Sequence, residues 1–204
     1  MYLDEQLVVL DKPAGLLAVP GRGEDKQDCL SARAQALWPD ALVVHRLDMA
    51  TSGLFVMGRS LHVQRLLSRA FAERGVQKRY EAVVAGDLGL AGTRGVIDLP
   101  LAADWPHRPL QKVDPDQGRP SSTRWEVLAR LPGATRLGLE PVTGRTHQLR
   151  VHLQAIGHPI LGDALYAPAE VQALAPRLLL HATSLQLAHP ATGEPLAFVS
   201  AAPF

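Results

Sequence analysis

One loop of the sequence places a carboxylate beside two basic side chains. Within residues 43–57, an apolar run is interrupted by HRLD at residues 45–48 and by TSG at residues 51–53. This pattern predicts a strand, a turn and a second strand. Strands hold such a loop rigidly while leaving it accessible, so Asp48 could serve there as a nucleophile or a base. A turn in which Asp48 only caps backbone N–H groups fits the same spacing and is the commoner use of such residues.

The composition is that of a soluble globular protein. The 204 residues are 47% hydrophobic and 20% charged, with a net charge of +1, and no apolar run is long enough to cross a bilayer. The acidic first residues lack the basic start of a signal peptide. The single cysteine, Cys29, excludes an internal disulfide and a multi-cysteine metal site. We therefore expect a cytoplasmic protein.

Arginine dominates the basic residues. Of the 21 basic side chains, 17 are arginine and four are lysine. Arginine binds phosphates through two donors and stacks on bases, which favours a nucleic-acid partner. A GC-rich genome would raise arginine and alanine together, and this chain is rich in both. Both explanations stay open at this point.

Hydrophobic periodicity predicts helices and strands in one domain, without repeats or linkers. Helices are expected at 29–37 with Asp28 as cap, at 60–74 between Ser60 and Gly75, and from the turn at Gly144 to Gly157. A short helix is expected near Glu170. Strands are expected at 6–10, 16–21, 77–86, 123–128 and 135–140, with a hairpin around 192–193.

Residues 98–120 differ in composition from the rest of the chain. Their five prolines exclude a central strand and predict an extended, irregular excursion. Basic residues, Arg108 and Lys112 among them, alternate with Trp105, a combination that suits an RNA backbone and unstacked bases. A rigid surface loop without a role in binding is the alternative.

A second polar loop opens the helix expected before Gly157. Residues 144–152 read GRTHQLRVH, and a helix that begins beside Arg145 is a favourable place for an anion. Helical spacing predicts an apolar stripe toward the core, formed by Leu149, Leu153 and Ile156. It places three polar side chains together on another face: His147, Arg150 and Gln154.

The histidines of this region do not make a convincing metal site. His147 and His152 are five residues apart and fall on different faces of a helix. Neither a cysteine nor a nearby carboxylate completes a tetrahedral set with them and His158. We expect no metal and no cofactor.

Six stretches of the chain, taken in order, resemble the RluA-type pseudouridine synthases. They are KPAG at 12–15, HRLD with TSGL at 45–54, KRY at 78–80, GRTHQLRVH at 144–152, GHPILGD at 157–163 and LLLHA at 178–182. The resemblance spans nearly the whole chain. It implies an α+β fold with a central, largely antiparallel mixed sheet flanked by helices, in one catalytic domain over residues 1–204. Many members carry an S4-like domain, for which this chain has no room.

The resemblance also implies a reaction and a partner. Members of this family isomerise uridine to pseudouridine in RNA without a cofactor. The stretches DWPHRP at 104–109 and QKV at 111–113 are most similar to the subgroup that modifies large-subunit ribosomal RNA and a tRNA anticodon stem-loop. The expected partners are therefore structured rRNA and tRNA stem-loops, and we expect neither a membrane nor an obligate protein partner for a monomeric enzyme.

The resemblance assigns three catalytic residues. Asp48 is the carboxylate that attacks the sugar or removes a sugar proton. Arg150 is the cation that keeps this carboxylate ionised, since burial alone would raise its pKa. Tyr80 stacks on the uracil, and its hydroxyl could relay a proton.

The target base must leave its stack, and Arg46 is expected to fill the vacated space. Further candidates for RNA binding are His45, Arg108, Lys112, Arg145 and His147.

Four other functions are weaker alternatives. The enzyme could act on only one rRNA or tRNA target, or the chain could be an RNA-binding module without catalysis. HRxD occurs in kinase catalytic loops, but here a residue intrudes before the Asp, and both the following Asn and a Gly-rich phosphate loop are missing. A glycosidase would need two carboxylates around the bond, and the motif offers one.

Overall fold

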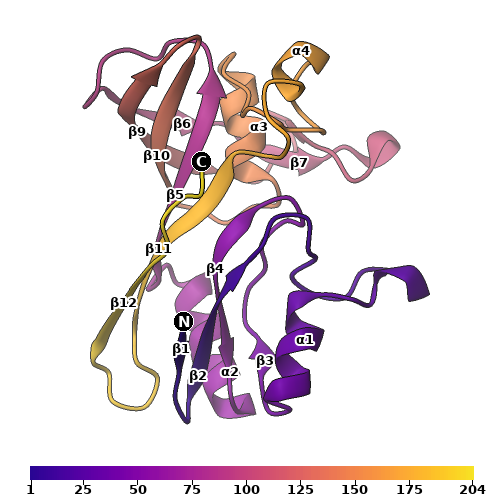
Figure 1. Ribbon diagram of the computed structural model, residues 1–204, viewed down its shortest axis with the longest axis vertical. Coiled ribbons are helices and arrows are strands. Elements are labelled where there is room, and N and C mark those ends of the chain that lie inside the picture. The colour runs from indigo at the N-terminus through magenta and orange to yellow at the C-terminus, as the bar shows by residue number, and fades with distance from the viewer. The chain divides into compact units, whose positions relative to one another are not determined.

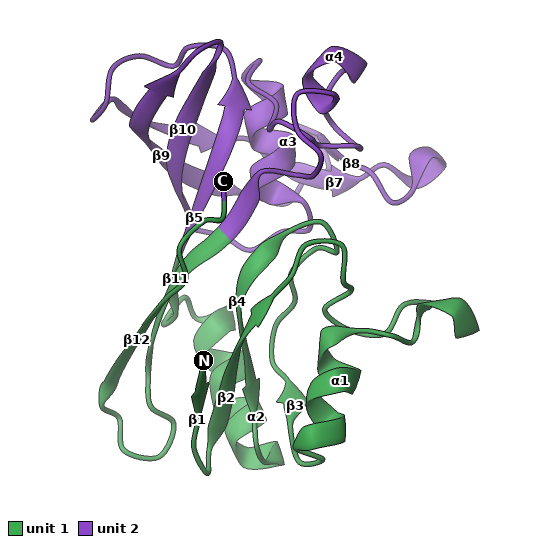
Figure 2. Cartoon of the chain, viewed as in Figure 1, with its two compact units in different colours: residues 1–78, 182–203 green, residues 79–181, 204 purple.

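The computed structural model describes residues 1–204, which divide into two compact units (Figure 2). Unit 1 consists of residues 1–78 and 182–203, and unit 2 of residues 79–181 with Phe204. Strands β5 (Gln77–Ala85) and β11 (Leu180–Ala188) each contain residues of both units. Each unit is described by itself below.

Unit 1 is a sheet with two helices. Its strands are ordered β1-β2-β4-β11, with β3 also paired to β4 and β12 to β11. The elements are β1 (Tyr2–Leu3), β2 (Leu7–Lys12), the 3-10 turn Glu24–Lys26, α1 (Leu30–Leu37), β3 (Leu42–Val43), β4 (Ser52–Gly58), α2 (Leu61–Ala72) and β12 (Pro195–Val199). The core forms where the apolar stripe of α2, Val63 and Leu67, packs with Val56 of β4 and Leu185 of β11.

Unit 2 contains the remaining strands, two helices and a separate hairpin. Strands follow the order β11-β5-β10-β9-β6, and β7 pairs with β8 in a separate two-stranded sheet. The elements are β6 (Arg94–Asp98), β7 (Leu101–Ala103), the 3-10 turn Trp105–His107, β8 (Gln111–Val113), β9 (Ser122–Leu131), β10 (Ala134–Pro141), α3 (Gln148–Ala155) and α4 (Ala169–Gln172). In Figure 1 the β7–β8 hairpin projects away from β5, β9 and β10.

The sheet is mixed. In unit 1, β1 pairs antiparallel with β2, and both β2 and β3 pair antiparallel with β4. In unit 2, β5 pairs antiparallel with β10, β10 with β9 and β9 with β6. The expected α+β fold class is confirmed. None of the helices is long and apolar enough to span a membrane.

Several expected elements form and others need correction. Ser60 caps α2 as predicted, its hydroxyl accepting from Val63 N. The predicted cap Asp28 is wrong, because Cys29 caps α1 while Asp28 pairs with Arg33 on the surface. The residue with positive φ after α2 is Arg74 rather than Gly75.

Two further expectations failed in part. No strand forms at 16–21, where the only ladder contact is an isolated bridge from Leu17 to Cys29. The excursion at 98–120 is more regular than its prolines suggested, because it folds as the β7–β8 hairpin. Its prolines fall outside those two strands, so the missing N–H groups cost no ladder hydrogen bond.

Candidate active site

A buried lysine holds the loop that carries Asp48. Lys12 is 0% exposed, and its Nζ donates to three carbonyl oxygens: Pro13 at 2.8 Å, Leu16 at 2.7 Å and Met49 at 3.0 Å. Gly15 N also donates to the Met49 carbonyl, at 2.9 Å. A buried ammonium needs such acceptors to offset its desolvation. Two donors therefore hold the residue directly after Asp48.

The Asp48 loop itself has no regular structure. Residues 44–48 lie between β3 and β4, and Thr51 N donates to the Asp48 carbonyl at 3.1 Å to form the turn into β4. The Asp48 side chain is half-buried and Arg46 is exposed. The turn that spacing predicted is therefore present, and a backbone hydrogen bond closes it.

His45 lies between two aromatic rings. Its ring is 4.5 Å from that of Phe71, stacked at 16°, and 4.8 Å from that of Phe55. Its Nε2 accepts from Val56 N at 3.1 Å. Burial lowers the pKa of His45 to about 3, and the charge of Lys78 adds to this effect. The imidazole is therefore neutral at physiological pH.

This contact explains how the loop leaves the sheet. β3 pairs with β4 only at Met57 and Gly58, so its backbone does not reach Val56. The imidazole nitrogen replaces the strand carbonyl that would otherwise accept from Val56 N. The chain can then turn away from β4 with its buried N–H group satisfied. His45, predicted to contact RNA, is thus placed to shape the loop.

Tyr80 and helix α3 share one face of the unit 2 sheet. The antiparallel register aligns Tyr80 with Leu139 and Leu139 with Trp125. Side chains alternate along a strand, so Thr123 lies on the same face as Trp125. Two side chains of α3, Gln148 and His152, bond Thr123 Oγ1 at 3.0 and 2.9 Å. Tyr80 and the helix that carries Arg150 therefore lie on one face of the unit 2 sheet.

Gln148 also organises the loop before α3. Its Oε1 accepts from Arg145 N at 3.0 Å and from Thr143 Oγ1 at 2.7 Å. Its Nε2 donates to the Ser122 carbonyl at 2.9 Å. The Arg145 side chain is exposed at this helix start. The loop geometry is thus set from within the helix rather than by a capping side chain.

Arg150 is buried, whereas the sequence placed it on a polar helix face with His147 and Gln154. Its side chain is 4% exposed, and it pairs with Asp163, whose side chain is 1% exposed. Nη2 donates to Asp163 Oδ1 at 2.6 Å and Nε to Oδ2 at 2.8 Å. The expected grouping was wrong: Gln154 is exposed, and His147 precedes α3 with a φ of 54°.

Asp163 and Tyr166 are the polar residues that sequence reasoning missed. The guanidinium carbon of Arg150 lies 5.1 Å from the centre of the Tyr166 ring. The Tyr166 hydroxyl bonds His147 Nδ1 at 2.7 Å and accepts from Gln111 N at 2.9 Å. Asp163 lies in GHPILGD, one of the six stretches that carry the family resemblance, and this was the only sequence feature that could have pointed to it. No periodicity could pair it with Arg150, since 13 residues and a turn separate them.

The β7–β8 hairpin exposes a stacked cation. Trp105 is 67% exposed, and the Arg108 guanidinium carbon lies 3.6 Å from the centre of its ring. Lys112, on β8, is exposed and 3.4 Å from Asp114. An aromatic ring and a planar cation presented together suit an unstacked base or a phosphate.

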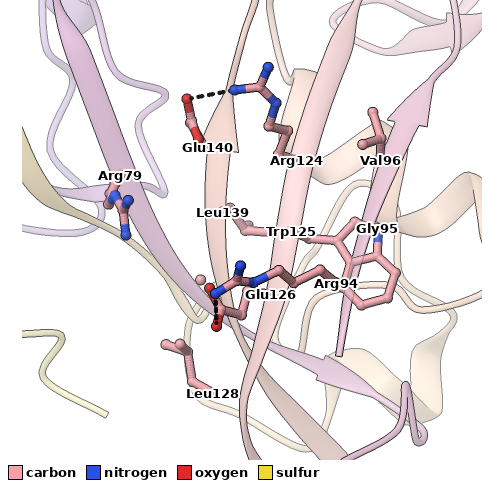
Figure 3. A pocket seen from close by; sticks show the side chains of 11 residues that line it. Arg79, Arg94, Gly95, Val96, Arg124, Trp125, Glu126, Leu128, Leu139 and Glu140 are labelled. Atoms are coloured by element: carbon pink, nitrogen blue, oxygen red, sulfur yellow. Dashed lines mark hydrogen bonds and ion pairs between the residues drawn. The ribbon is translucent and has the colours of Figure 1, made fainter. Parts of the chain in front are cut away.

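A hollow of about 540 Å³ lies in unit 2, but it is not the place of a base stacked on Tyr80. Figure 3 shows four of its five charged side chains joined in two pairs, Arg94 with Glu126 and Arg124 with Glu140. By register and alternation these four side chains lie on the face opposite to Tyr80. Two of its three cations, Arg94 and Arg124, are also neutralised by neighbouring carboxylates, which makes the hollow a poor phosphate site.

Comparison with known proteins decides the family. The sequence model of the RNA pseudouridylate synthase family matches residues 6–155. The chain belongs to this family. The synthase is 49% identical over 205 residues to the dual-specificity RNA pseudouridine synthase RluA of Escherichia coli (strain K12), covering 100% of this chain and 93% of the relative. It is 48% identical to the protein of the same name from Yersinia pestis, with 100% and 98% covered.

Solved structures agree with the family. The synthase has a TM-score of 0.80 and 27% identity to human RNA pseudouridylate synthase domain containing 1, covering 100% of this chain and 82% of that one. For human RNA pseudouridylate synthase domain containing 4 the values are 0.78 and 27%, with 99% and 87% covered. The predicted family, fold and enzyme class are confirmed: the protein is an RNA-modifying isomerase that forms pseudouridine.

Proposed function

We propose that this synthase is dual-specific and modifies uridines in large-subunit ribosomal RNA and in a tRNA anticodon stem-loop. The observation that carries the proposal is the identity of 49% across the whole chain to a protein named for dual specificity. The DWPHRP stretch forms an exposed hairpin tip, which offers one surface that either stem-loop could use.

Asp48 is the reacting carboxylate in this proposal. The reaction breaks the N1–C1′ bond, turns the uracil, joins C5 to C1′ and moves the C5 proton to N1, so atoms balance without a cofactor. An ionised carboxylate can begin it by attacking C1′ or by removing a sugar proton. The fastening of Met49 by Lys12 and Gly15 N supports this assignment, because a nucleophile must be held in place.

Tyr80, Arg150 and Arg46 have distinct parts. Tyr80 stacks on the uracil as it turns. Arg150 contributes the positive charge that favours an ionised carboxylate during the reaction. Arg46, exposed in the same loop as Asp48, occupies the space that the flipped nucleotide leaves.

Binding of the RNA backbone falls to exposed cations of unit 2. Arg108 on its Trp105 platform and Lys112 contact the stem-loop from the hairpin. Arg145 contacts a phosphate at the start of α3, with His147 beside it.

Tritium release tests the reaction and its specificity together. The purified synthase, incubated with either stem-loop made with 5-tritiated uridine, should release tritium from both. Asp48→Asn, which keeps the shape of the side chain and removes its charge, should reduce release from both RNAs by at least about 10³-fold, as for other covalent or acid–base residues. Release from one RNA alone would overturn dual specificity. Full activity of Asp48→Asn would overturn the role of Asp48.

The proposal also includes a monomer that acts as one catalytic domain in the cytoplasm. The chain's lone cysteine and its RNA substrates support this location. Light scattering at working concentration tests the monomer, and a dimer mass would overturn it.

A further inference from the structure

The loop at residues 162–166 holds Arg150 from two sides. One side is the Asp163 carboxylate, which receives two parallel hydrogen bonds of 2.6 and 2.8 Å from the guanidinium. The other is the Tyr166 ring, 5.1 Å from the guanidinium carbon. A two-point ion pair fixes the orientation of the guanidinium plane as well as its position.

Asp163 is itself held firmly. Its Oδ1 also accepts from Leu165 N at 2.9 Å and from Tyr166 N at 3.2 Å, so the carboxylate closes the turn that carries Tyr166. Gly162, with φ at 72°, makes the approach possible: a Cβ there would lie 1.9 Å from the Arg177 carbonyl oxygen. The loop therefore fixes the Asp163 carboxylate and the Tyr166 ring together.

Tyr166 links this loop to the hairpin. Its hydroxyl accepts from Gln111 N, the first residue of β8, at 2.9 Å and bonds His147 Nδ1 at 2.7 Å. β8 carries Lys112, and the turn before it carries Arg108. A single hydroxyl thus joins the hairpin to the loop before α3.

We infer that Asp163 and Tyr166 are positioning residues for pseudouridine formation: Asp163 sets the orientation of Arg150, and the Tyr166 hydroxyl sets the position of the β7–β8 hairpin against which RNA binds. The inference rests on the proposed roles of Arg150 and the hairpin. It assigns the two residues different effects. Asp163 acts on the chemical step through Arg150, whereas the Tyr166 hydroxyl acts on RNA affinity.

Single-turnover rates at saturating enzyme, with the RNA Kd measured separately, distinguish these effects. Asp163→Asn should slow the chemical step by about 10- to 100-fold, the cost of a misplaced group, and change Kd by less than about 3-fold. Tyr166→Phe keeps the ring over Arg150 and removes the hydroxyl. It should weaken Kd by about 5- to 10-fold, the worth of the lost hydrogen bond that holds the hairpin at Gln111 N, and leave the single-turnover rate unchanged. Asp28→Asn is the matched control, because it breaks the same kind of pair with Arg33 on the surface and should change neither quantity.

A double-mutant cycle separates positioning from a general loss of structure. If Asp163 acts through Arg150, Asp163→Asn should add less than about 2-fold to the loss already caused by Arg150→Met. The double variant should also unfold at a higher temperature than Arg150→Met alone, which leaves the Asp163 carboxylate buried without its cation. This comparison stays decisive even if Asp163→Asn alone does not fold.

The outcomes separate the inference from the proposed function. A wild-type rate for Arg150→Met would overturn the proposed role of Arg150 and the inference with it. A slow Arg150→Met beside an unaffected Asp163→Asn, or losses that multiply in the double variant, would overturn the inference alone. A Tyr166→Phe variant that slows the chemical step and keeps Kd would overturn the role of its hydroxyl.

Discussion

At the scale of the residue, His45 shows how a polar side chain can replace part of a strand. Its Nε2 accepts from Val56 N, which β3 does not reach. This requires a neutral ring, and burial provides one by lowering the pKa of His45 to about 3. His45, next to the exposed Arg46, therefore helps to fix the conformation of the loop.

This predicts a pH dependence of stability. Between pH 3 and 6.5 the unfolded chain protonates His45 and the folded protein does not, so stability falls as pH decreases through this range. The slope from this residue is at most about 1.4 kcal/mol per pH unit. His45→Phe keeps the stacking on Phe71 but leaves Val56 N without its acceptor, which costs about 1–3 kcal/mol at pH 7. The variant lacks the titrating group, so its deficit should shrink by about 2 kcal/mol between pH 7 and pH 5.

Urea unfolding of both proteins at the two pH values measures the difference. Asp4, whose pKa is lowered by hydrogen bonds from Tyr2 and from the backbone of Leu7 against the effect of burial, gives an acid-side slope of the same sign, but it is common to both proteins. Parallel pH curves for the wild type and His45→Phe would show that His45 titrates normally when folded.

At the scale of the element, the start of β4 depends on a glycine. Gly53 has a φ of 110°, and a Cβ there would lie 2.4 Å from the Ala182 carbonyl oxygen of β11 and 2.6 Å from its nitrogen. Both atoms belong to backbone and cannot rotate away. The TSG sequence therefore lets β4 approach β11 directly after the Asp48 turn.

Gly53→Ala should destabilise the protein by about 3 kcal/mol or more, since backbone strain and steric overlap add. Gly133→Ala is the matched control: its φ is 68°, yet nothing lies within 4 Å of its Cβ position. It should cost only about 1 kcal/mol, the strain of the left-handed conformation. Thermal unfolding compares the two, and equal losses would mean that β4 can move away from β11.

The same elements show what the sequence could predict. The stripe of α2 and its Ser60 cap depend on neighbours within a few residues, so periodicity was sufficient. The helix at 148–155 was also expected, but its polar side chains were judged as if it were isolated. Arg150 is buried because Asp163 offers a carboxylate from a later turn, and this long-range pairing leaves no periodic trace. Asp48 and Tyr80 were singled out only through the resemblance, since their spacing alone fits an ordinary turn and strand.

At the scale of the whole molecule, a net charge of +1 implies that RNA binding depends on a few local cations. Many arginines are already paired on the surface, as Arg124 is with Glu140 and Arg33 with Asp28. Such pairs release few counterions when RNA approaches, because the carboxylate already neutralises the cation. The salt dependence of binding should therefore report the cations proposed to contact RNA.

Three cations are proposed to bind the RNA backbone: Arg108, Lys112 and Arg145. Lys112 already lies 3.4 Å from Asp114, so its contact should release little. At about 0.7 to 0.9 per neutralised phosphate, the plot of log Kd against log salt concentration should have a slope of about 2. Arg108→Ala should lower that slope by about 0.8, and Arg124→Ala, on the sheet face opposite to Tyr80, should leave it unchanged. Filter binding of a tRNA anticodon stem-loop at several salt concentrations measures all three slopes. If Arg124→Ala lowered the slope as much as Arg108→Ala, RNA would contact the face that bears the hollow, and the hairpin would not be the principal binding surface.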